Sequence, residues 1–449
     1  MNEAKRNVTV FLLFLLLALS FIACSETGYR NAIPKQSTAL VSFDIAQLSG
    51  VNNVALLKAL LHLKNVDDSG IDFSQKLYLF ESADGNLGVC AKVQSADKLA
   101  KLFEKLGSVP QVYRGARFAA IGNSWIAGYT DEALLLMGPV PVAAQAEMRS
   151  KMAKYLQQDE DNSIVVSPMY AKLDSINTAI AMVAQAQALP EQFIAPLTIG
   201  MPKDADASQV LIAAEMQVKK GCLTILGTPF SFNRHIRQAL QEASEVYRPI
   251  RGKYVGALSK TALLGMFVNV EGRRFLPLLQ ANKGLQVLLT GINQAIDLDN
   301  IIRSIDGDMA IVVPAYAKNR MKLSMAAQLS HIDWAGDIGY WKQSVPKGSR
   351  LTDWKKNAYR YTDGTNSFYF GTTDDLQFYS GSDAEEAEAC VGGAKDAIDG
   401  DMQKAIIGER MVMIVNLDNI ENPTMRMFSE LLKPVFGPIH TIVYKLKKQ

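Results

Sequence analysis

Hydrophobic and polar residues alternate along the chain in an order that predicts an α+β fold. Residues 39–45, ALVSFDI, form an apolar run that is typical of a buried strand. Residues 54–64, VALLKALLHLK, place apolar side chains three and four positions apart, as in an amphipathic helix. Two short strands then flank Asp84 and Gly85, a pair typical of hairpin turns, and Ser95 precedes a second amphipathic helix.

The same order of elements recurs later in the chain. Residues 264–272, LGMFVNVEG, correspond to the first strand, and residues 308–329 correspond to the hairpin. The stretch NSWIAGYTDEALLLMG, residues 123–138, aligns without a gap with NSFYFGTTDDLQFYSG, residues 366–381. The shared Asn, Ser, Gly, Thr and acidic positions suit turns. We therefore interpret the stretch as a hairpin and not as a reactive loop.

Internal similarity predicts tandemly duplicated modules of antiparallel β-sheet with flanking helices. A third, partial copy begins at residues 411–433. We expect the short polar residues that end the three opening strands, Asp44, Asn269 and Asn416, to bond to nearby backbone amides. The predicted organisation is a lipoprotein signal peptide at 1–23, a tether at 24–36, module copy 1 at 37–158, a middle half-module at 159–254, module copy 2 at 255–400, and a partial C-terminal copy at 401–449 that packs on the preceding modules.

The amino-terminal segment predicts export. Lys5 and Arg6 precede an apolar run from Val8 to Ala23, and Cys24 follows it. This order is typical of an export leader, and it resembles the bacterial lipoprotein signal, in which the cysteine after the cut carries the lipid. We therefore predict lipid attachment at Cys24.

Two alternatives to lipidation stay open. Phe21 stands where the lipoprotein signal usually has an aliphatic residue. Cleavage after Ser25 would give a soluble periplasmic protein, and the apolar run is at the lower length limit for an uncleaved membrane anchor. The other cysteines, at positions 90, 222 and 390, are odd in number and indicate no disulfide framework.

Charge and histidine content argue against two classes of function. The 47 basic and 45 acidic residues nearly cancel, so the chain has no long-range field that would attract nucleic acid. The four histidines are too far apart in sequence to show a local metal-binding spacing. We expect no nucleic-acid partner, no cofactor and no metal ligands.

Common catalytic motifs are absent from the sequence, but a partial penicillin-binding set is present. Residues 95–98 (SADK) fit S-x-x-K, residues 231–233 (SFN) fit S-x-N, and residues 260–262 (KTA) approach K-T-G without the final glycine. Ser330 stands in the second copy where Ser95 stands in the first, but no lysine follows it. We interpret both serines as helix caps and assign no catalytic residue.

Acidic and aromatic groupings also have structural interpretations. Residues 157–163 and 297–308 are rich in acids, but neither fits the calcium-binding loop pattern, so we expect solvated turns. Trp334, Ile338 and Trp341 lie at helical spacing. That spacing favours a place in the core over a sugar-binding platform.

The tether and the first strand resemble the start of an uncharacterised lipoprotein family of Bacteroidota, a domain of unknown function. Ile33, Pro34, Ser37 and the strand at 41–45 carry the resemblance. It implies an address in the cell envelope and α+β repeats, and the family has no assigned activity.

These observations predict a cell-envelope lipoprotein that is not an enzyme and that binds a protein or glycan partner or has a structural role. Its membrane contact is the lipid on Cys24. Ser25 and Glu26 differ from the aspartate that retains many lipoproteins at the inner membrane, so we expect the outer membrane, in either a periplasmic or a surface-facing orientation. The alternative is an envelope or polysaccharide hydrolase whose carboxylates meet only in the folded protein.

Overall fold

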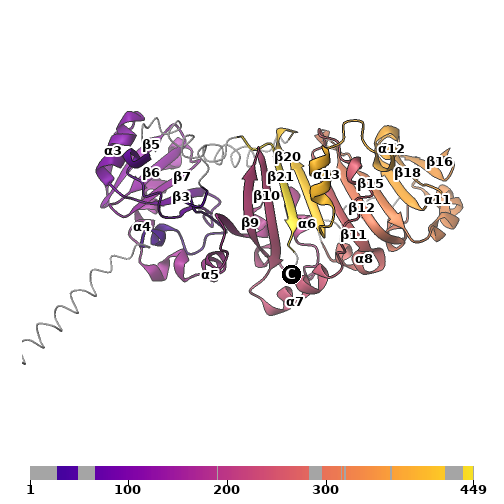
Figure 1. Ribbon diagram of the computed structural model, residues 1–449, viewed down its shortest axis with the longest axis horizontal. Coiled ribbons are helices and arrows are strands. Elements are labelled where there is room, and N and C mark those ends of the chain that lie inside the picture. The colour runs from indigo at the N-terminus through magenta and orange to yellow at the C-terminus, as the bar shows by residue number, and fades with distance from the viewer. Residues whose placement is uncertain are drawn as a thin grey trace, which may run out of the picture. The chain divides into compact units, whose positions relative to one another are not determined.

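The helices and strands of the computed structural model confirm the expected α+β class. The structure describes residues 28–48, 66–189, 191–282, 296–314, 316–317, 320–364, 367–419 and 438–447. They belong to two compact units, Met1–Ala179 (unit 1) and Ile180–Gln449 (unit 2), drawn in Figure 1. The signal peptide, Cys24 and the helix expected at 54–64 lie outside the described residues.

Unit 1 contains one antiparallel sheet whose neighbouring strands are not all consecutive in sequence. From edge to edge its described strands are β1 (Ala39–Phe43), β2 (Leu77–Glu81), β3 (Leu87–Lys92), β7 (Ala133–Gly138), β6 (Trp125–Tyr129), β5 (Ala116–Ile121) and β4 (Gln111–Tyr113). After β3 the chain crosses through a helix to the far edge and then returns strand by strand. Among the described residues, β4 therefore pairs with β5 alone.

Two helices cover opposite faces of this sheet. Helix α3 (Ala96–Lys105) begins after Ser95, whose side chain accepts a backbone hydrogen bond at 3.3 Å, so the predicted cap is confirmed. Apolar residues of α3 share a buried cluster with Ala127 of β6. The next residue of β6, Gly128, points to the other face, where a Cβ would contact α4 (Gln145–Tyr155).

Unit 2 contains a longer sheet, in which one pair of strands is parallel. In spatial order its strands are β8 (Ile180–Gln185), β9 (Leu211–Lys219), β10 (Cys222–Phe230), β21 (Thr441–Leu446), β20 (Met411–Asn416), β11 (Leu264–Glu271), β12 (Ile305–Val313), β15 (Ser324–Leu329), β19 (Gln377–Gly381), β18 (Ser367–Thr372), β17 (Ala358–Thr362) and β16 (Arg350–Lys355). Its α-helices include α6 (Glu191–Leu197), α7 (Arg234–Ser244), α8 (Gly272–Ala281), α10 (Leu298–Arg303), α11 (Ile338–Ser344), α12 (Ala384–Gly392) and α13 (Gly400–Ile406).

The strands from β11 to β16 follow the same order as the strands of unit 1. Both series run through three adjacent strands, cross to an edge and return. The last strands of the chain, β20 and β21, lie between β10 and β11, as Figure 1 shows. β20 and β21 pair with each other in antiparallel orientation, and β21 pairs with β10 in parallel orientation. The C-terminal segment thus joins the middle strands to the second series.

The two stretches that align in the sequence are both hairpins, β6–β7 and β18–β19, as predicted. Their registers differ by one residue. In the first hairpin Gly128 lies opposite Leu135. The gapless alignment makes Gly371 and Phe378 the equivalent pair, but in the structure Gly371 lies opposite Tyr379. Leu376 occupies the turn with φ of 60°, a left-handed conformation that accommodates the extra residue.

The interpretation of Ser330 as a helix cap is wrong. Its hydroxyl and its backbone N–H both donate to the carbonyl of Ser304, at 3.0 and 2.8 Å. These bonds continue the contact between β12 and β15 beyond their ends. A 3-10 helix at Asp333–Asp337 then precedes α11, and Trp334 within it is buried.

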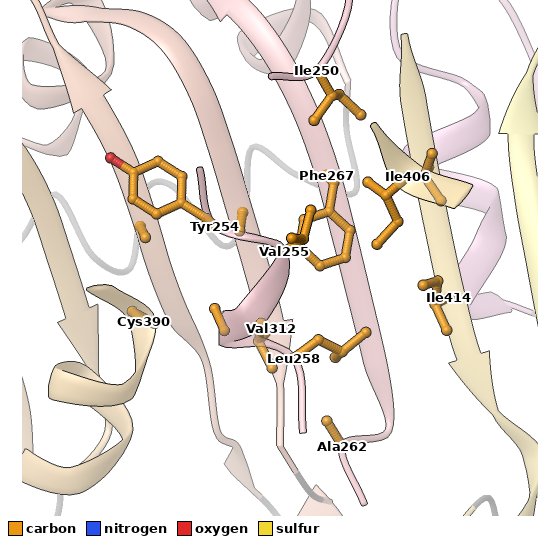
Figure 2. Close-up of a cluster of buried hydrophobic side chains, with 14 of the residues drawn as sticks. Ile250, Tyr254, Val255, Leu258, Ala262, Phe267, Val312, Cys390, Ile406 and Ile414 are labelled. Atoms are coloured by element: carbon orange, nitrogen blue, oxygen red, sulfur yellow. The ribbon is translucent and has the colours of Figure 1, made fainter. Parts of the chain in front are cut away.

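The core of unit 2 includes the segment that precedes β11. Tyr254, Val255 and Leu258 are buried in one cluster with Phe267 of β11 and Ile414 of β20. Figure 2 shows Val255 and Leu258 close to Phe267. Because these side chains are removed from water together, the segment before the strand is fixed to the sheet.

Candidate functional site

The serines and the asparagine of the partial penicillin-binding set stabilise local structure. Ser95 caps α3. Ser231 donates to the Gln209 carbonyl at 2.6 Å, and Asn233 accepts from the backbone of His235 at 2.9 Å where α7 begins. These polar groups are engaged in caps and turns, so their geometry is not that of a nucleophile held against a base.

The two acidic runs that we expected to be solvated turns differ in the structure. The run at 157–163 is a largely exposed turn, as expected. Asp159 caps a short 3-10 helix by accepting from Asn162 N at 3.1 Å. Asp297 caps α10 by accepting from Asn300 N at 2.9 Å. Asp308, at the end of the second run, lies in β12 and is only 4% exposed. The interpretation of 297–308 as a turn is therefore wrong, because capping and strand pairing organise it.

The buried Asp308 carboxylate fixes the segment before β11 to the sheet. It accepts backbone hydrogen bonds from Arg251 at 2.9 Å, Gly252 at 2.7 Å and Lys253 at 2.9 Å. Gly252 has φ of 96°, so the chain turns its successive N–H groups toward one anion. These bonds compensate the burial of the charge and leave the carboxylate committed to the fold.

The cysteines in the described part of the chain are free thiols in apolar surroundings. Cys90 is fully buried, and burial raises the pKa of its thiol. Burial likewise raises the pKa of Cys390 to about 12 and, to a smaller extent, that of Cys222. Each is neutral near pH 7 and is therefore a weak nucleophile. The described His, Cys, Asp and Glu residues form no group of three that could hold a metal ion.

The polar residues at the ends of the opening strands were expected to bond to nearby amides, and two of them do. Asp44 and Asn416 each accept a backbone hydrogen bond at 3.1 Å from two or three residues further on. Asn269 differs because β11 continues past it. It is 2% exposed, accepts from Arg248 Nε at 3.0 Å and donates to the Pro249 carbonyl at 2.9 Å.

The strands at the β16 end of unit 2 carry a concentration of half-buried aromatic residues. We call these residues, together with the exposed Arg360 between two of them, the aromatic sheet end: Trp354, Tyr359, Arg360, Tyr361, Phe368 and Tyr369. The sequence patterns did not single it out. The available signal was the alternation of aromatic residues in AYRYT and the run of three aromatic residues in SFYF, which become β17 and β18.

One face of the aromatic sheet end combines rings with cations. The Trp354 and Tyr369 rings meet edge to face, with centroids 4.9 Å apart and planes at 73°. Arg360 pairs with Tyr369 across the strands, and its guanidinium lies 5.5 Å from that ring. Lys355 Nζ lies 4.8 Å from the Trp354 ring. This is the combination of side chains that dominates the energetics of protein interfaces.

The opposite face is supported by α11. Lys342 of this helix lies 5.6 Å from the ring of Tyr359. Tyr361 donates a hydrogen bond to Ser349 at 3.0 Å, and Phe368 stacks on the buried Phe370 with centroids 5.9 Å apart. The rings are therefore held in place before any partner binds, which lowers the entropic cost of binding.

The tryptophans of the α11 region belong to the core, as predicted. Trp334 and Trp341 are 2% and 6% exposed, and their rings stack with centroids 5.9 Å apart. Trp334 also meets Phe378 edge to face at 6.2 Å. They stabilise the sheet from within and are not available as a platform.

The amino-terminal part of unit 1 differs from the expected tether. Gly28–Ala32 form a 3-10 helix, in which Tyr29 is 1% exposed, and Ile33 is fully buried. Tyr29 donates a hydrogen bond to the carbonyl of Lys76 at 2.7 Å. Apolar residues in GYRNAI thus attach the chain to the sheet from Gly28 onward, so the expected tether at 24–36 ends no later than residue 27.

A cluster around Arg30 holds this segment in place. The guanidinium lies 5.8 Å from the Tyr29 ring and 5.9 Å from the Tyr170 ring, and it donates to the Tyr170 hydroxyl. Tyr78 lies between these tyrosines, with centroid distances of 6.2 and 6.3 Å. Burial raises the pKa of both Tyr29 and Tyr78, which keeps their hydroxyls neutral.

The fold and its polar groups define an α+β protein with extended antiparallel sheets. Within the described ranges, no helix is long and apolar enough to span a bilayer. The chain belongs to the family described as Domain of unknown function (DUF4836), which matches residues 38–433. No curated protein matches the chain.

Solved structures titled crystal forms of TP0453 show only a distant likeness. Form IV is 10% identical, with a TM-score of 0.28, and the match covers 44% of this chain and 78% of that one. Form III is 7% identical, with a TM-score of 0.25, and the match covers 81% and 96%. Scores this low establish neither a shared fold nor a shared function.

Proposed function

We propose that this protein is a cell-envelope lipoprotein that binds a protein partner through the aromatic sheet end, without catalysing a reaction. The observation that carries the proposal is the pre-arranged group of Trp354, Tyr369 and Arg360 at the end of the unit 2 sheet. Tryptophan, tyrosine and arginine are the residues most enriched where binding energy concentrates in protein interfaces.

The cations favour a protein over a glycan as the partner. A sugar ring binds by stacking on a free aromatic face. Lys355 lies over Trp354 at 4.8 Å and Arg360 over Tyr369 at 5.5 Å, so a cation already lies over each ring. Lys355 already forms an ion pair with Glu388 of α12, so Arg360 is the cation to which a protein partner can supply a carboxylate while it covers the half-buried rings.

Photo-crosslinking in intact cells tests this proposal. A photoreactive residue at position 352, on the same face of β16 as Trp354, is expected to capture one predominant protein. The Arg360→Ala variant, which alters an exposed side chain, should reduce that adduct several-fold. Phe232, 48% exposed elsewhere in unit 2, gives the matched control position. The same adducts at 352 and 232, or adducts with polysaccharide alone, would refute a protein-binding site.

The envelope address is part of the same proposal. The leader that ends at Ala23, directly before Cys24, supports lipidation, and family membership is compatible with it. We place the protein at the outer membrane because Ser25 and Glu26 follow the cysteine. Palmitate labelling of the wild type and of Cys24→Ala, followed by membrane fractionation, checks both points. Equal labelling of the two proteins would exclude lipidation at this cysteine.

Duplication of a seven-strand module is the proposed origin of the architecture. The support is the common strand order of unit 1 and of the β11–β16 series, with hairpins at the two aligned stretches. β8, β9 and β10 repeat the first three strands, and β20 and β21 repeat the first two. Asp308 and the two acids that cap helices are committed to the fold, so these three carboxylates give the hydrolase alternative no support.

A further inference from the structure

Apolar side chains are exposed together along the β4 edge of unit 1. Among the described residues, nine large hydrophobic side chains are exposed, and four of them fall between positions 106 and 113. Leu106 is 43% exposed, Val109 73%, Val112 76% and Tyr113 39%. We call these four residues the apolar strip. A concentration of this kind indicates a contact surface, because single exposed hydrophobic residues are otherwise scattered.

The form of the edge does not suit the addition of another strand. β4 has only three residues, and Pro110, which precedes it, has no N–H to donate. Strand register also places Val112 and Tyr113 on opposite faces of the sheet, so no single flat face is presented. An apolar medium that surrounds the edge on both sides fits this geometry better than a folded partner.

Basic residues border the apolar strip. Between positions 97 and 117 the sequence has five basic residues, at 98, 101, 105, 114 and 117, against two acids, at 97 and 104. Arg117 is partly neutralised by Asp97 at 3.8 Å. Arg114 lies over the Tyr113 ring at 5.2 Å. Valine, leucine and tyrosine surrounded by lysine and arginine are typical of segments that rest in the interface of an anionic membrane.

The first described residues, 28–33, lie on the same side of unit 1 as the β4–β5 turn. Gln158 donates to the carbonyls of Asn31 and Ile33, the latter at 3.0 Å. The adjacent residue, Gln157, donates to the carbonyl of Arg114 in the turn. The side chains of Gln157 and Gln158 therefore connect the segment at 31–33 with Arg114, which follows the apolar strip.

The chain between the lipid site and the fold is short. Gly28 is the fourth residue after Cys24, and four residues span at most about 14 Å in any conformation. An anchor at Cys24 therefore holds this side of unit 1 within reach of lipid headgroups.

We propose that the apolar strip enters the interface of the bilayer to which Cys24 is attached, so that unit 1 rests on the membrane at its β4 edge. The inference depends on the lipid anchor of the proposed function. Lipid is the occupant because the tether is short, the strip is bordered by positive charge and the edge is unsuited to strand pairing.

An environment-sensitive fluorophore tests this contact. The full lipidated chain, with Cys222→Ser to limit background labelling, is reconstituted in vesicles of phosphatidylethanolamine and phosphatidylglycerol. A nitrobenzoxadiazole label is attached through Val109→Cys or through Val142→Cys, the matched control with the same 73% exposure in the same unit. The label at 109 should shift to shorter wavelength and be quenched several-fold more by a lipid-bound spin label.

Vesicle flotation separates the two possible failures. Protein that floats but shows equal emission and quenching at 109 and 142 overturns the membrane contact and leaves the anchor intact. Protein that does not float overturns the anchor, and the contact with it. As a second measurement, Val109→Asp with Val112→Asp should increase cleavage by trypsin after Arg114 on vesicles, whereas Val142→Asp should not. Because these side chains are exposed, the variants are expected to fold.

Discussion

The edge strands β4 and β16 occupy the same place in two series of strands with the same order, yet they differ in chemistry. β4, QVY, is preceded by exposed leucine and valine. β16, RLTDWK, carries three charged residues and borders the aromatic sheet end. Charged side chains on an edge strand oppose pairing with other chains, whereas an exposed apolar edge favours burial against another surface. The shared strand order fixes where each edge lies, while the edge residues make one edge apolar and the other charged.

The largest expected effect comes from the aromatic residue buried behind each edge. Phe118 contacts Tyr113 beside β4, and Phe370 contacts Tyr359 near β16. Truncating either to alanine leaves a cavity and should lower the free energy of unfolding of its own unit by about 3–5 kcal/mol. Hydrogen exchange measured peptide by peptide should show the loss in that unit. Equal loss of protection in both units would contradict the expectation that each truncation destabilises only its own unit.

A smaller loss is expected when the carboxylate that fixes the second series is neutralised. Asp308→Asn replaces one acceptor with an NH2 group facing backbone donors, so at least one buried N–H loses its partner. Urea denaturation should show a loss of about 1–3 kcal/mol. Asp306→Asn, two residues away, alters a 49% exposed partner of Arg248 and should cost less than about 1 kcal/mol. Similar losses would refute the role of Asp308.

Exchanging the edge chemistry should change association with little change in stability. Asp353→Val combined with Lys355→Val gives β16 an apolar edge similar to β4, and we expect concentration-dependent self-association in sedimentation experiments. The free energy of unfolding should change by less than about 1 kcal/mol, since both side chains are on the surface. If the variant stays monomeric, the charges of β16 are not what protects this edge.

The smallest expected effect is a pH dependence near the aromatic sheet end. Hydrogen bonds from Gln377 and Thr373, with a contribution from Lys253, lower the pKa of Asp375 to about 2. A carboxyl whose pKa is lower in the folded state stabilises the protein above its unfolded pKa of about 4, and this contribution is lost as pH falls from about 4 to about 2. The Asp375 side chain is 63% exposed, so screening limits the effect to a few tenths of a kcal/mol, roughly. Asp375→Asn should flatten that part of the acid-unfolding curve.

Local patterns in the sequence were sufficient for elements whose partners are near in the chain. The hairpins, the Ser95 cap and the buried tryptophans follow from turn residues and from apolar spacing. The prediction that Ser330 caps a helix was wrong because this serine bonds to Ser304, which lies 26 residues away and is not specified by any local pattern. The one-residue difference in hairpin register at Leu376 could not be predicted either, because register depends on the facing strand.

The candidate surfaces were less predictable than the fold. The aromatic sheet end needs three strands in register before Trp354 meets Tyr369. The expected tether is polar in sequence, but Tyr29 and Ile33 within it are buried in the folded protein. Both features depend on contacts that form only in the tertiary structure, and a single sequence does not encode such contacts in a recognisable local pattern.

The position of β21 sets the order in which unit 2 can be completed. Cys222 of β10 lies opposite Thr441, so β10 acquires this neighbour only after the 219 residues up to Thr441 have been synthesised. Contacts between positions so distant in sequence form slowly. If the chain is exported, as proposed above, this delay keeps the unit 2 sheet incomplete until β20 and β21 have been added, so the polypeptide can still pass through a membrane channel.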